Sequence, residues 1–248
     1  PPRSRTCAAS MASRGDWPAG SVVIATIMGV AFAVGAGGSL NCFIERHTDA
    51  KMSRTSWRPL PGGRMRPAES LVFGTVLWLI SYFILYHFVN PPTAFLTMLA
   101  FGTYVGLYTP LKSRTPLCTL VGAIPGALPP LIGWTAVRGH AEFSGFLLFL
   151  FLFVWQIPHF LALALLRQDE YRNAGLPILP VTEGEAATLD QILLYTAALV
   201  PISLAPYAVM NAGGVYLCLA IVMGCGFLWL AVRGRFCGSS KSWCKTFF

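Results

Sequence analysis

The sequence predicts an all-α protein, a polytopic transmembrane helical bundle of about seven spans. Of its 248 residues, 55% are hydrophobic and only 11% are charged, and the mean hydropathy is +0.61. These values lie outside the range of soluble proteins. The apolar residues form runs, most of which approach the roughly 20 residues that cross a bilayer core. The runs are continuously apolar rather than alternating, which indicates helices and not the strands of a membrane barrel.

Seven spans follow one another along the chain. They are expected at Ser21–Ile44, Leu71–Val89, Ala94–Tyr108, Leu117–Val137, Phe143–Leu166, Gln191–Met210 and Ala212–Val232. The first carries no formal charge over its whole length. The third is short for a membrane and must include flanking polar residues. The fourth contains Pro125, Pro129 and Pro130 among several glycines. That composition predicts an irregular helix, which lines a cavity or packs closely through small residues.

Residues 20–248 are expected to form a single domain. The preceding segment, residues 1–19, is polar and atypical, and it lacks the apolar core of a cleavable signal peptide. The seven cysteines are scattered and form no C-x-x-C pair. They predict free, mostly buried thiols rather than a disulfide framework or a metal cluster.

The net charge of +8 is distributed unevenly. If the spans alternate, residues 45–67, 110–116, 166–189 and 233–248 share one side of the membrane and hold 14 of the 18 Lys and Arg residues, whereas the opposite loops hold only Arg138. This positive-inside pattern predicts an integral membrane protein of the bacterial cytoplasmic membrane or the mitochondrial inner membrane. Its charged loops would face the cytoplasm or the matrix. The lipid bilayer is then the expected surroundings and nucleic acid is not a partner. Arg3, Arg5 and Arg14 do not fit the pattern.

A row of polar side chains ends the first span. Asn41, Glu45 and Asp49 are spaced i, i+4, i+8, so on a helix each step turns by only about 40° and the three line one face. Oxygen-bearing side chains at the mouth of a membrane helix are costly unless a cation binds there, so the row indicates a functional site. The alternative is a solvated helix end whose acids pair with nearby Lys and Arg residues.

A second acidic cluster, Asp169 and Glu170, is expected on the same membrane side, and Arg167, Glu170 and Tyr171 would share a helix face. Mg²⁺ prefers hard oxygen ligands and often bridges carboxylates to phosphates. Lys and Arg bind the remaining phosphate oxygens. Two acidic clusters followed by bases are therefore typical of a Mg²⁺–diphosphate site.

The pattern N-x-x-x-[D/E]-x-x-x-D over residues 41–49, followed by K-M-x-R-T-x-x-R-P-L, resembles the intramembrane prenyltransferases of the UbiA superfamily. Further segments resemble one branch of it, the protohaem IX farnesyltransferases or haem O synthases. These segments are Tyr108–Lys112, Gly122–Trp134, Trp155–Phe160 and the run from Glu170 to Val181. The resemblance extends from about residue 20 to the last residues.

The resemblance implies transfer of a farnesyl group from farnesyl diphosphate to a vinyl group of haem b, giving haem O for haem A and terminal oxidases. It implies catalytic roles for Asn41, Glu45, Asp49 and Glu170. The Mg²⁺ ligands would be Asn41, Glu45, Asp49, Asp169 and Glu170, with Asp169 an alternative to Glu170. The diphosphate contacts would be Lys51, Arg54, Arg58, Lys112, Arg114, Arg167 and Tyr171. The family often has Asp where Glu45 and Glu170 stand, and Glu places the carboxylate on a longer arm.

Haem recognition would lie deeper in the membrane. His159 is a candidate ligand of haem iron, and hydrogen bonding between helices is its alternative role. On an unbroken helix His159 and Glu170 would lie roughly 16 Å apart on nearly one face. Trp155 and Tyr108 are the aromatic residues expected to line the pocket. Tyr104, Phe149, Phe153 and Phe160 are more simply explained by packing against lipid or helices.

Three other interpretations remain open at this point. Another UbiA-type prenyltransferase would act on an aromatic or quinone-precursor acceptor. A non-catalytic membrane protein would use the acidic rows as an ion site. The family normally has nine spans, so a chain with seven could also be an inactive truncated fragment. For an active enzyme, haem A synthase or oxidase assembly proteins are the expected protein partners.

Overall fold

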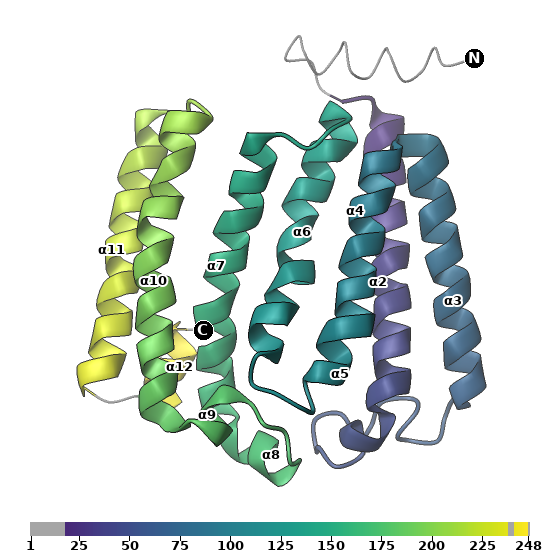
Figure 1. Ribbon diagram of the computed structural model, residues 1–248, viewed down its shortest axis with the longest axis horizontal. Helices are drawn as coiled ribbons and strands as arrows, with labels where there is room; N and C mark the ends of the chain where they lie inside the picture. Colours follow the sequence, from purple (N-terminus) through teal and green to yellow (C-terminus); the bar gives the residue numbers. More distant parts are fainter. Residues whose placement is uncertain (1–17, 238–240, 248) are drawn as a thin grey trace. The chain divides into compact units, whose positions relative to one another are not determined.

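The computed structural model describes residues 18–237 and 241–247, and this part of the chain consists of helices, turns and loops with no strand (Figure 1). Arg3, Arg5, Arg14 and nearly all of the atypical segment 1–19 lie outside the described residues. Seven helical spans are long and apolar enough to cross a membrane. They are Gly20–Asp49, Pro67–Val89, Pro91–Leu111, Cys118–Arg138, Phe143–Leu166, Gly184–Val209 and Gly214–Phe236. The predicted all-α class and its seven spans are confirmed.

The chain divides into two compact units, and each is described by itself. The first comprises the described residues as far as Thr109, together with Leu128–Gly145. The second comprises Pro110–Ala127 and the described residues from Phe146 onward. The expectation that residues 20–248 form a single domain stays a prediction.

In the first unit, α2 (Gly20–Asp49) packs lengthwise against α3 (Pro67–Ile84) (Figure 1). Small residues make this contact close. A methyl group added at Gly74 of α3 would lie 3.0 Å from the side chain of Leu40 of α2. The hydroxyl of Ser81 donates a 2.7 Å hydrogen bond to the carbonyl of Gly29. The two helices therefore associate as small-residue membrane helices do, through backbone approach and interhelical hydrogen bonds.

The third span combines three helical segments. It consists of α4 (Pro91–Gly102), the π-helical turn η2 (Thr103–Tyr108) and the short α5 (Thr109–Leu111). The whole span has 21 residues, so the apolar run Ala94–Tyr108 is extended by its flanks as predicted. Asn90 begins the span, since its side-chain oxygen accepts a 2.9 Å hydrogen bond from the backbone N–H of Thr93.

The irregular helix predicted over Leu117–Val137 is wrong. Helix α6 runs without a break from Cys118 to Arg138, through Pro125, Pro129 and Pro130. Each proline removes only one backbone donor, and the turns before and after it keep their own hydrogen bonds. The π-helical segments lie elsewhere, in η1 (Leu85–Val89) and in η2.

The second unit has a core around the side chains of α7 (Phe143–Leu166) and α10 (Gly184–Val209), where Ile157 and Ile192 are almost completely buried. The short C-terminal helix α12 (Lys241–Phe247) adds Trp243 to this core. Cys118 and Cys244 are also buried, but Cys218 and Cys225 are exposed, so the expectation of mostly buried thiols is wrong for the latter two.

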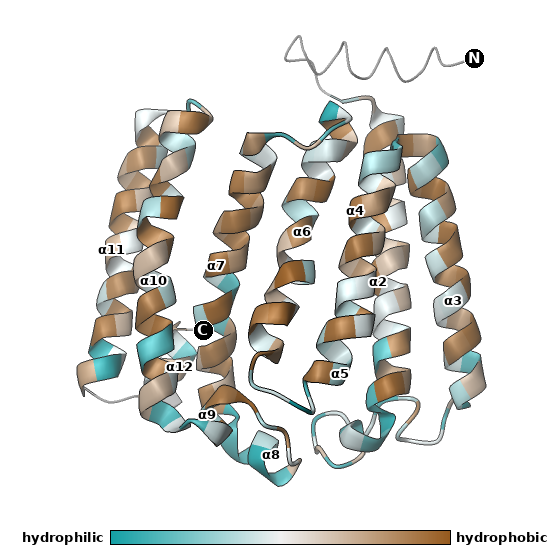
Figure 2. Cartoon of the chain, in the orientation of Figure 1, coloured by the Kyte–Doolittle hydropathy of each residue, from teal (hydrophilic) through white to brown (hydrophobic). Residues whose placement is uncertain are grey.

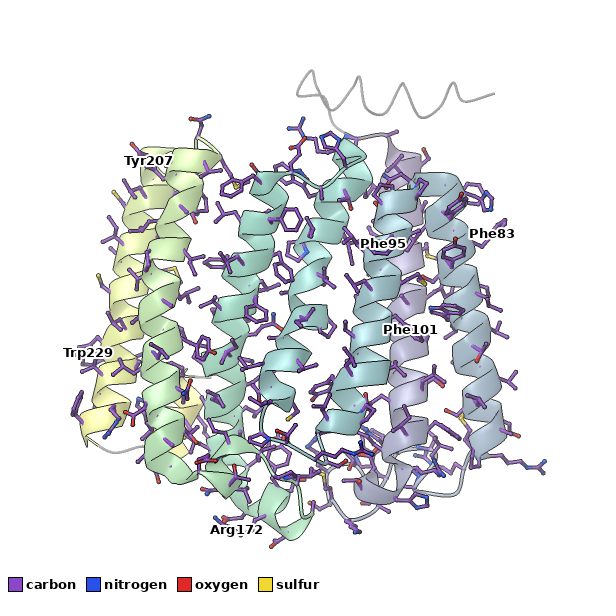
Figure 3. The ribbon with its side chains drawn as sticks, in the orientation of Figure 1. Phe83, Phe95, Phe101, Arg172, Tyr207 and Trp229 are labelled. Atoms are coloured by element: carbon purple, nitrogen blue, oxygen red, sulfur yellow. The ribbon has the colours of Figure 1, made fainter. Side chains whose placement is uncertain are left out.

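The long helices are hydrophobic along most of their length and hydrophilic near some of their ends (Figure 2). Figure 2 shows hydrophobic residues along α10 and α11 (Gly214–Cys237), with hydrophilic residues where α10 begins and α11 ends. There Arg235 forms an ion pair with Asp190. Exposed aromatic side chains point outward from the helices, Phe83 from α3 and Trp229 from α11 (Figure 3). In a bilayer these faces meet lipid rather than water.

Candidate functional site

The acidic row lies on a buried face at the end of α2. Asn41, Glu45 and Asp49 are only 7%, 8% and 3% exposed. The spacing explains this shared burial, because residues four apart on a helix point to the same side. A solvated helix end would leave such side chains in water, so the solvation expected in that alternative is wrong for the row, whereas the acid–base pairing it expects does occur at Asp49.

The side chain of Asn41 forms hydrogen bonds with Glu45 of its own helix and with Thr109 of another span. Its side-chain amide donates to Oε2 of Glu45 at 3.2 Å. Its side-chain oxygen accepts from the hydroxyl of Thr109 at 2.9 Å. Thr109 is 3% exposed and belongs to α5, so this contact ties the third span to the row on α2.

Asp49 is held by the loop that follows it. Nη1 of Arg58 lies 2.8 Å from Oδ2 of Asp49. The hydroxyl of Thr55 donates to the backbone carbonyl of Asp49 at 3.0 Å. The loop then turns at Gly63, whose φ of 69° is a left-handed conformation that glycine adopts readily. The loop thus folds back onto the mouth of α2.

The charge of Arg58 is maintained by its surroundings. Partial burial acts to lower the pKa of Arg58. The hydrogen bond and negative charge of Asp49, with a smaller contribution from Glu45, act to raise this pKa and outweigh the effect of burial. The net effect is a pKa above the ordinary value for arginine. Arg58 therefore brings a full positive charge to the acidic row.

The other predicted diphosphate contacts of the first unit lie outside this buried cluster. Lys51 and Arg54 are exposed on the same loop. Tyr108, which is predicted to line the haem pocket and not to contact the diphosphate, is half-buried and stacks on Tyr104, with ring centroids 5.5 Å apart. Arg58 is thus a predicted cation in direct contact with the row.

In the second unit, the break between α7 and α8 (Gln168–Asn173) lies at Arg167, whose φ of −113° and ψ of 19° leave the helical range. The unbroken helix assumed between His159 and Glu170 is therefore wrong, and the separation derived from it stays a prediction. A backbone hydrogen bond of 3.1 Å from Tyr171 to the carbonyl of Arg167 preserves one turn. Arg167, Glu170 and Tyr171 are all half-buried.

The two neighbouring acids of α8 have different surroundings. Asp169 is exposed and pairs with Arg172 at 3.2 Å. Arg172 itself is exposed and projects from α8 (Figure 3). Glu170, in contrast, has its Oε1 atom buried without a hydrogen-bond partner among the described residues. An unsatisfied buried carboxylate oxygen is costly, so Glu170 is the acid of this pair that calls for a cation or donor.

The short segment before α6, which contains Lys112 and Arg114, also belongs to the second unit. Lys112 is half-buried and Arg114 is exposed. Both residues precede Cys118, the first residue of α6.

An aromatic cluster occupies one face of α7. The rings of Trp155 and His159 stack with centroids 5.0 Å apart and an interplanar angle of 20°. Trp155 is 36% exposed and His159 is half-buried. Gln156 points to another face, where it is buried against Gly126 of α6. Trp155 and His159 thus present a flat surface, the shape that a planar ligand requires.

Sequence reasoning did not single out Thr55 or Thr109. Both contact the acidic row through their hydroxyls. Their positions inside the segments K-M-x-R-T and Tyr108–Lys112 are the signal that could have indicated them.

The donor set suits Mg²⁺ only in part. Among the described residues, no three His, Cys, Asp or Glu side chains come together in a way that could hold a metal ion. The carboxylates of the row and the unsatisfied oxygen of Glu170 are nevertheless the hard ligands that Mg²⁺ prefers. Each cluster, taken by itself, would supply part of the ligand set of such an ion.

Comparison with known sequences identifies relatives over most of the chain. Residues 5–248 match the UbiA prenyltransferase family. A protein of Myxococcus xanthus named protoheme IX farnesyltransferase is 44% identical over 253 residues, covering 100% of this chain and 86% of that protein. A protein of the same name from Aromatoleum aromaticum is 47% identical over 207 residues, covering 83% of this chain and 68% of that protein.

Solved structures share the fold. A UbiA homolog from Archaeoglobus fulgidus, bound to GPP and Mg²⁺, has a TM-score of 0.71 at 17% identity, covering 92% of this chain and 83% of that one. An apo UbiA homolog from Aeropyrum pernix K1 has a TM-score of 0.73 at 19% identity, covering 97% and 89%. At these identities the comparison establishes a common architecture.

Proposed function

The chain belongs to the UbiA prenyltransferase family, and on that premise we propose that it transfers a farnesyl group from farnesyl diphosphate to a vinyl group of haem b, giving haem O. The observation that carries this proposal is the 44% identity, across the whole chain, to a relative named protoheme IX farnesyltransferase. The buried acidic row supports the diphosphate part of the proposal.

The reaction begins with cleavage of the allylic C1–O bond, and the diphosphate leaves with the bonding electron pair. Farnesyl C1 then bonds to the terminal vinyl carbon of haem b. Water adds its oxygen to the other vinyl carbon and releases a proton, which leaves a hydroxyl group on haem O. The difficult step is the first, because negative charge accumulates on the leaving group and must be stabilised as it develops.

We assign Asn41, Glu45 and Asp49 to the Mg²⁺–diphosphate site. When bound, Mg²⁺ supplies positive charge that stabilises the leaving diphosphate. Asn41 holds Glu45 through the 3.2 Å hydrogen bond, and Arg58 offsets the charge of Asp49 at 2.8 Å. These contacts preorganise the row before substrate arrives, so less rearrangement is required during the reaction.

The cations complete the diphosphate site in this proposal. Arg58 lies nearest to the row, and its planar guanidinium suits bidentate phosphate binding. The exposed cations of the first loop would contact the outer phosphate oxygens. With the residues assigned from the second unit, the full set of phosphate contacts is Lys51, Arg54, Arg58, Lys112, Arg114, Arg167 and Tyr171.

Glu170 is proposed as the acid of the second cluster, in preference to Asp169. Its buried, unsatisfied Oε1 supports this choice. Helices α2 and α7 are the first and fifth spans, so alternating spans bring their C-terminal ends to the same side of the membrane. On that count of spans, and on the family membership, we propose that each of the two clusters takes part in diphosphate binding.

Haem b would be recognised by the aromatic face of α7. His159 is proposed as a contact to haem iron, a usual role for imidazole. The stacked ring of Trp155 would support the imidazole and shield the allylic cation from water, and Tyr108 is proposed on the pocket wall. These roles separate acceptor recognition from diphosphate chemistry.

The protein is an integral membrane protein of its family, with seven spans in the described residues. We further propose that its acidic clusters face the cytoplasm or the mitochondrial matrix. The concentration of Lys and Arg residues in the corresponding loops supports this orientation.

The decisive experiment reconstitutes the purified chain in lipid nanodiscs with Mg²⁺, farnesyl diphosphate and haem b. The expected result is haem O, identified by mass and by a changed haem spectrum. A parallel reaction supplies 4-hydroxybenzoate as acceptor. An unchanged haem spectrum together with prenylated 4-hydroxybenzoate would overturn the haem assignment and leave the prenyltransferase chemistry in place.

Expression in cells that lack haem O synthase extends this test to the membrane of a living cell. Pigment extracts are expected to contain haem O. Its absence from cells that hold well-expressed, membrane-inserted protein would contradict the proposed function.

A further inference from the structure

We propose that Thr109 is a positioning residue for the acidic row, acting on Glu45 through the side chain of Asn41. The inference rests on the proposed function, because it concerns the same diphosphate site. It assigns a role to a residue outside that site's metal and phosphate contacts. Thr109 lies on the third span, 68 residues from Asn41 in the chain, and their side chains are 2.9 Å apart.

The donor and acceptor groups of Thr109, Asn41 and Glu45 fix the direction of the hydrogen bonds between them. An ionised carboxylate only accepts hydrogen bonds, so the group of Asn41 that faces Oε2 of Glu45 must be its NH₂. The amide oxygen of Asn41 then faces Thr109, which must donate its hydroxyl proton to it. Donation therefore runs in one direction, from Thr109 to Asn41 and from Asn41 to Glu45.

The backbone near Thr109 explains how its hydroxyl reaches the row. Thr109 follows the π-helical turn η2, and its N–H bonds to the carbonyl of Tyr104. A π turn contains one residue more than an α turn, which rotates all later residues by about 100° relative to a regular α-helix. The irregular turn thus sets the face on which Thr109 lies.

The hydroxyl of Thr109 has a competing acceptor, since the Tyr104 carbonyl also lies 2.9 Å away. A hydroxyl carries a single proton and cannot donate fully to both oxygens. When that proton is directed to Asn41, the amide is held with its NH₂ toward Glu45. Without the hydroxyl, the Asn41 side chain loses one of the two hydrogen bonds that oppose its rotation, and its NH₂ is held less firmly toward Glu45.

The matched control is Thr97 of α4. Thr97 is buried to the same degree as Thr109, but its hydroxyl bonds to the backbone carbonyl of Thr93 in its own helix. Thr97→Val therefore removes a buried hydroxyl from the same span without touching the row. Valine has nearly the shape of threonine, so both Thr→Val variants conserve volume.

The test measures binding of farnesyl diphosphate in nanodiscs by calorimetry across a range of Mg²⁺ concentrations. For Thr109→Val, the Mg²⁺ concentration that gives half-maximal binding should rise about 10-fold to 100-fold, as is typical when a residue that orients a metal ligand is removed. Thr109→Ser, which keeps the hydroxyl, should restore the wild-type value. Thr97→Val should leave the value unchanged.

A double variant tests whether Thr109 acts through Asn41. Once Asn41→Ala has removed the intermediate side chain, adding Thr109→Val should produce no further loss of binding, because coupled residues are not additive. Should Thr109→Val not fold, Thr109→Ala takes its place with the same criteria. The proposal is overturned by a wild-type Mg²⁺ response in the hydroxyl-free variant, by failure of serine to rescue it, or by additive losses.

The binding readout separates this proposal from the proposed function. If the wild-type chain binds farnesyl diphosphate with Mg²⁺ but leaves haem b unmodified, the acceptor assignment fails and the Thr109 comparison still decides its own question. If the wild-type chain shows no Mg²⁺-dependent binding at all, both proposals are overturned.

Discussion

The guanidinium of Arg58 lies 2.8 Å from the carboxylate of Asp49, and this ion pair closes the first loop onto the last residue of α2. Asp49 is the most deeply buried acid of the row, at 3% exposure. A buried carboxylate without a partner pays a large desolvation cost. In the absence of substrate, Arg58 is thus a cation that stabilises Asp49.

Replacing Arg58 by leucine is expected to destabilise the protein. The change leaves the Asp49 carboxylate buried and unpaired, which costs about 3–5 kcal/mol for a fully buried pair. Because the Arg58 side chain is 28% exposed, we expect the lower end, about 3 kcal/mol. Denaturant unfolding in nanodiscs measures it. The double variant Arg58→Leu/Asp49→Asn should recover most of the loss, and equal stability of Arg58→Leu and wild type would contradict the role of the pair.

Glu170 and Asp169 are expected to differ in catalysis although they are adjacent. Glu170→Gln should lower kcat/KM for farnesyl diphosphate about 100-fold, since it removes a charged oxygen from the site. Asp169→Asn should change kcat/KM by no more than about twofold, because its partner Arg172 is exposed and surface pairs contribute little. Steady-state kinetics with haem b in excess distinguishes the two, and the opposite ranking would show that Asp169 is the working acid.

His159→Ala should weaken the binding of haem b without affecting the diphosphate. We expect the Kd for haem b to rise about tenfold, which corresponds to roughly 1.4 kcal/mol of binding free energy. The Soret band of bound haem should shift as the iron ligand changes. The control is His140→Ala, since His140 pairs with Glu142 in a loop of the first unit. An unaltered haem spectrum in His159→Ala would remove the residue from the pocket.

Gly234→Ala should destabilise the second unit through a steric clash. A methyl group at Gly234 would lie 2.2 Å from the ring of Trp243. The ring cannot withdraw easily, because its N–H donates to the Leu230 carbonyl at 2.9 Å. Overpacking of this kind costs about 1–3 kcal/mol, measured as a lower midpoint of thermal unfolding. Gly226→Ala on the same helix has open space around the new methyl and should be neutral or stabilising.

Local periodicity accounts for the parts of the structure that the sequence predicts well. The seven spans follow from continuous apolar runs, and the common burial of Asn41, Glu45 and Asp49 follows from their spacing of four. Both are properties of short segments. A helix repeats its geometry, so a pattern within one segment is sufficient to predict which residues share a face.

Contacts between distant segments were not predictable in the same way. The bond between Thr109 and Asn41 depends on a π turn, whose extra residue leaves no periodic pattern in the apolar runs. The break at Arg167 likewise interrupts what reads as a continuous helix from α7 into α8. The prolines of α6 caused the opposite error. They predict an irregular helix, whereas α6 is continuous.

Helix α4 and the segments that extend it are fastened at both ends within the first unit. Before its first turn, the amide of Asn90 donates to the carbonyl of Thr135 at 2.9 Å, and beyond its last turn Thr109 bonds to Asn41. Both hydrogen bonds involve side chains that belong to this one span or cap its start. A displacement of the whole span along its axis would therefore disturb the contact beside Asn90 and the contact with the acidic row together.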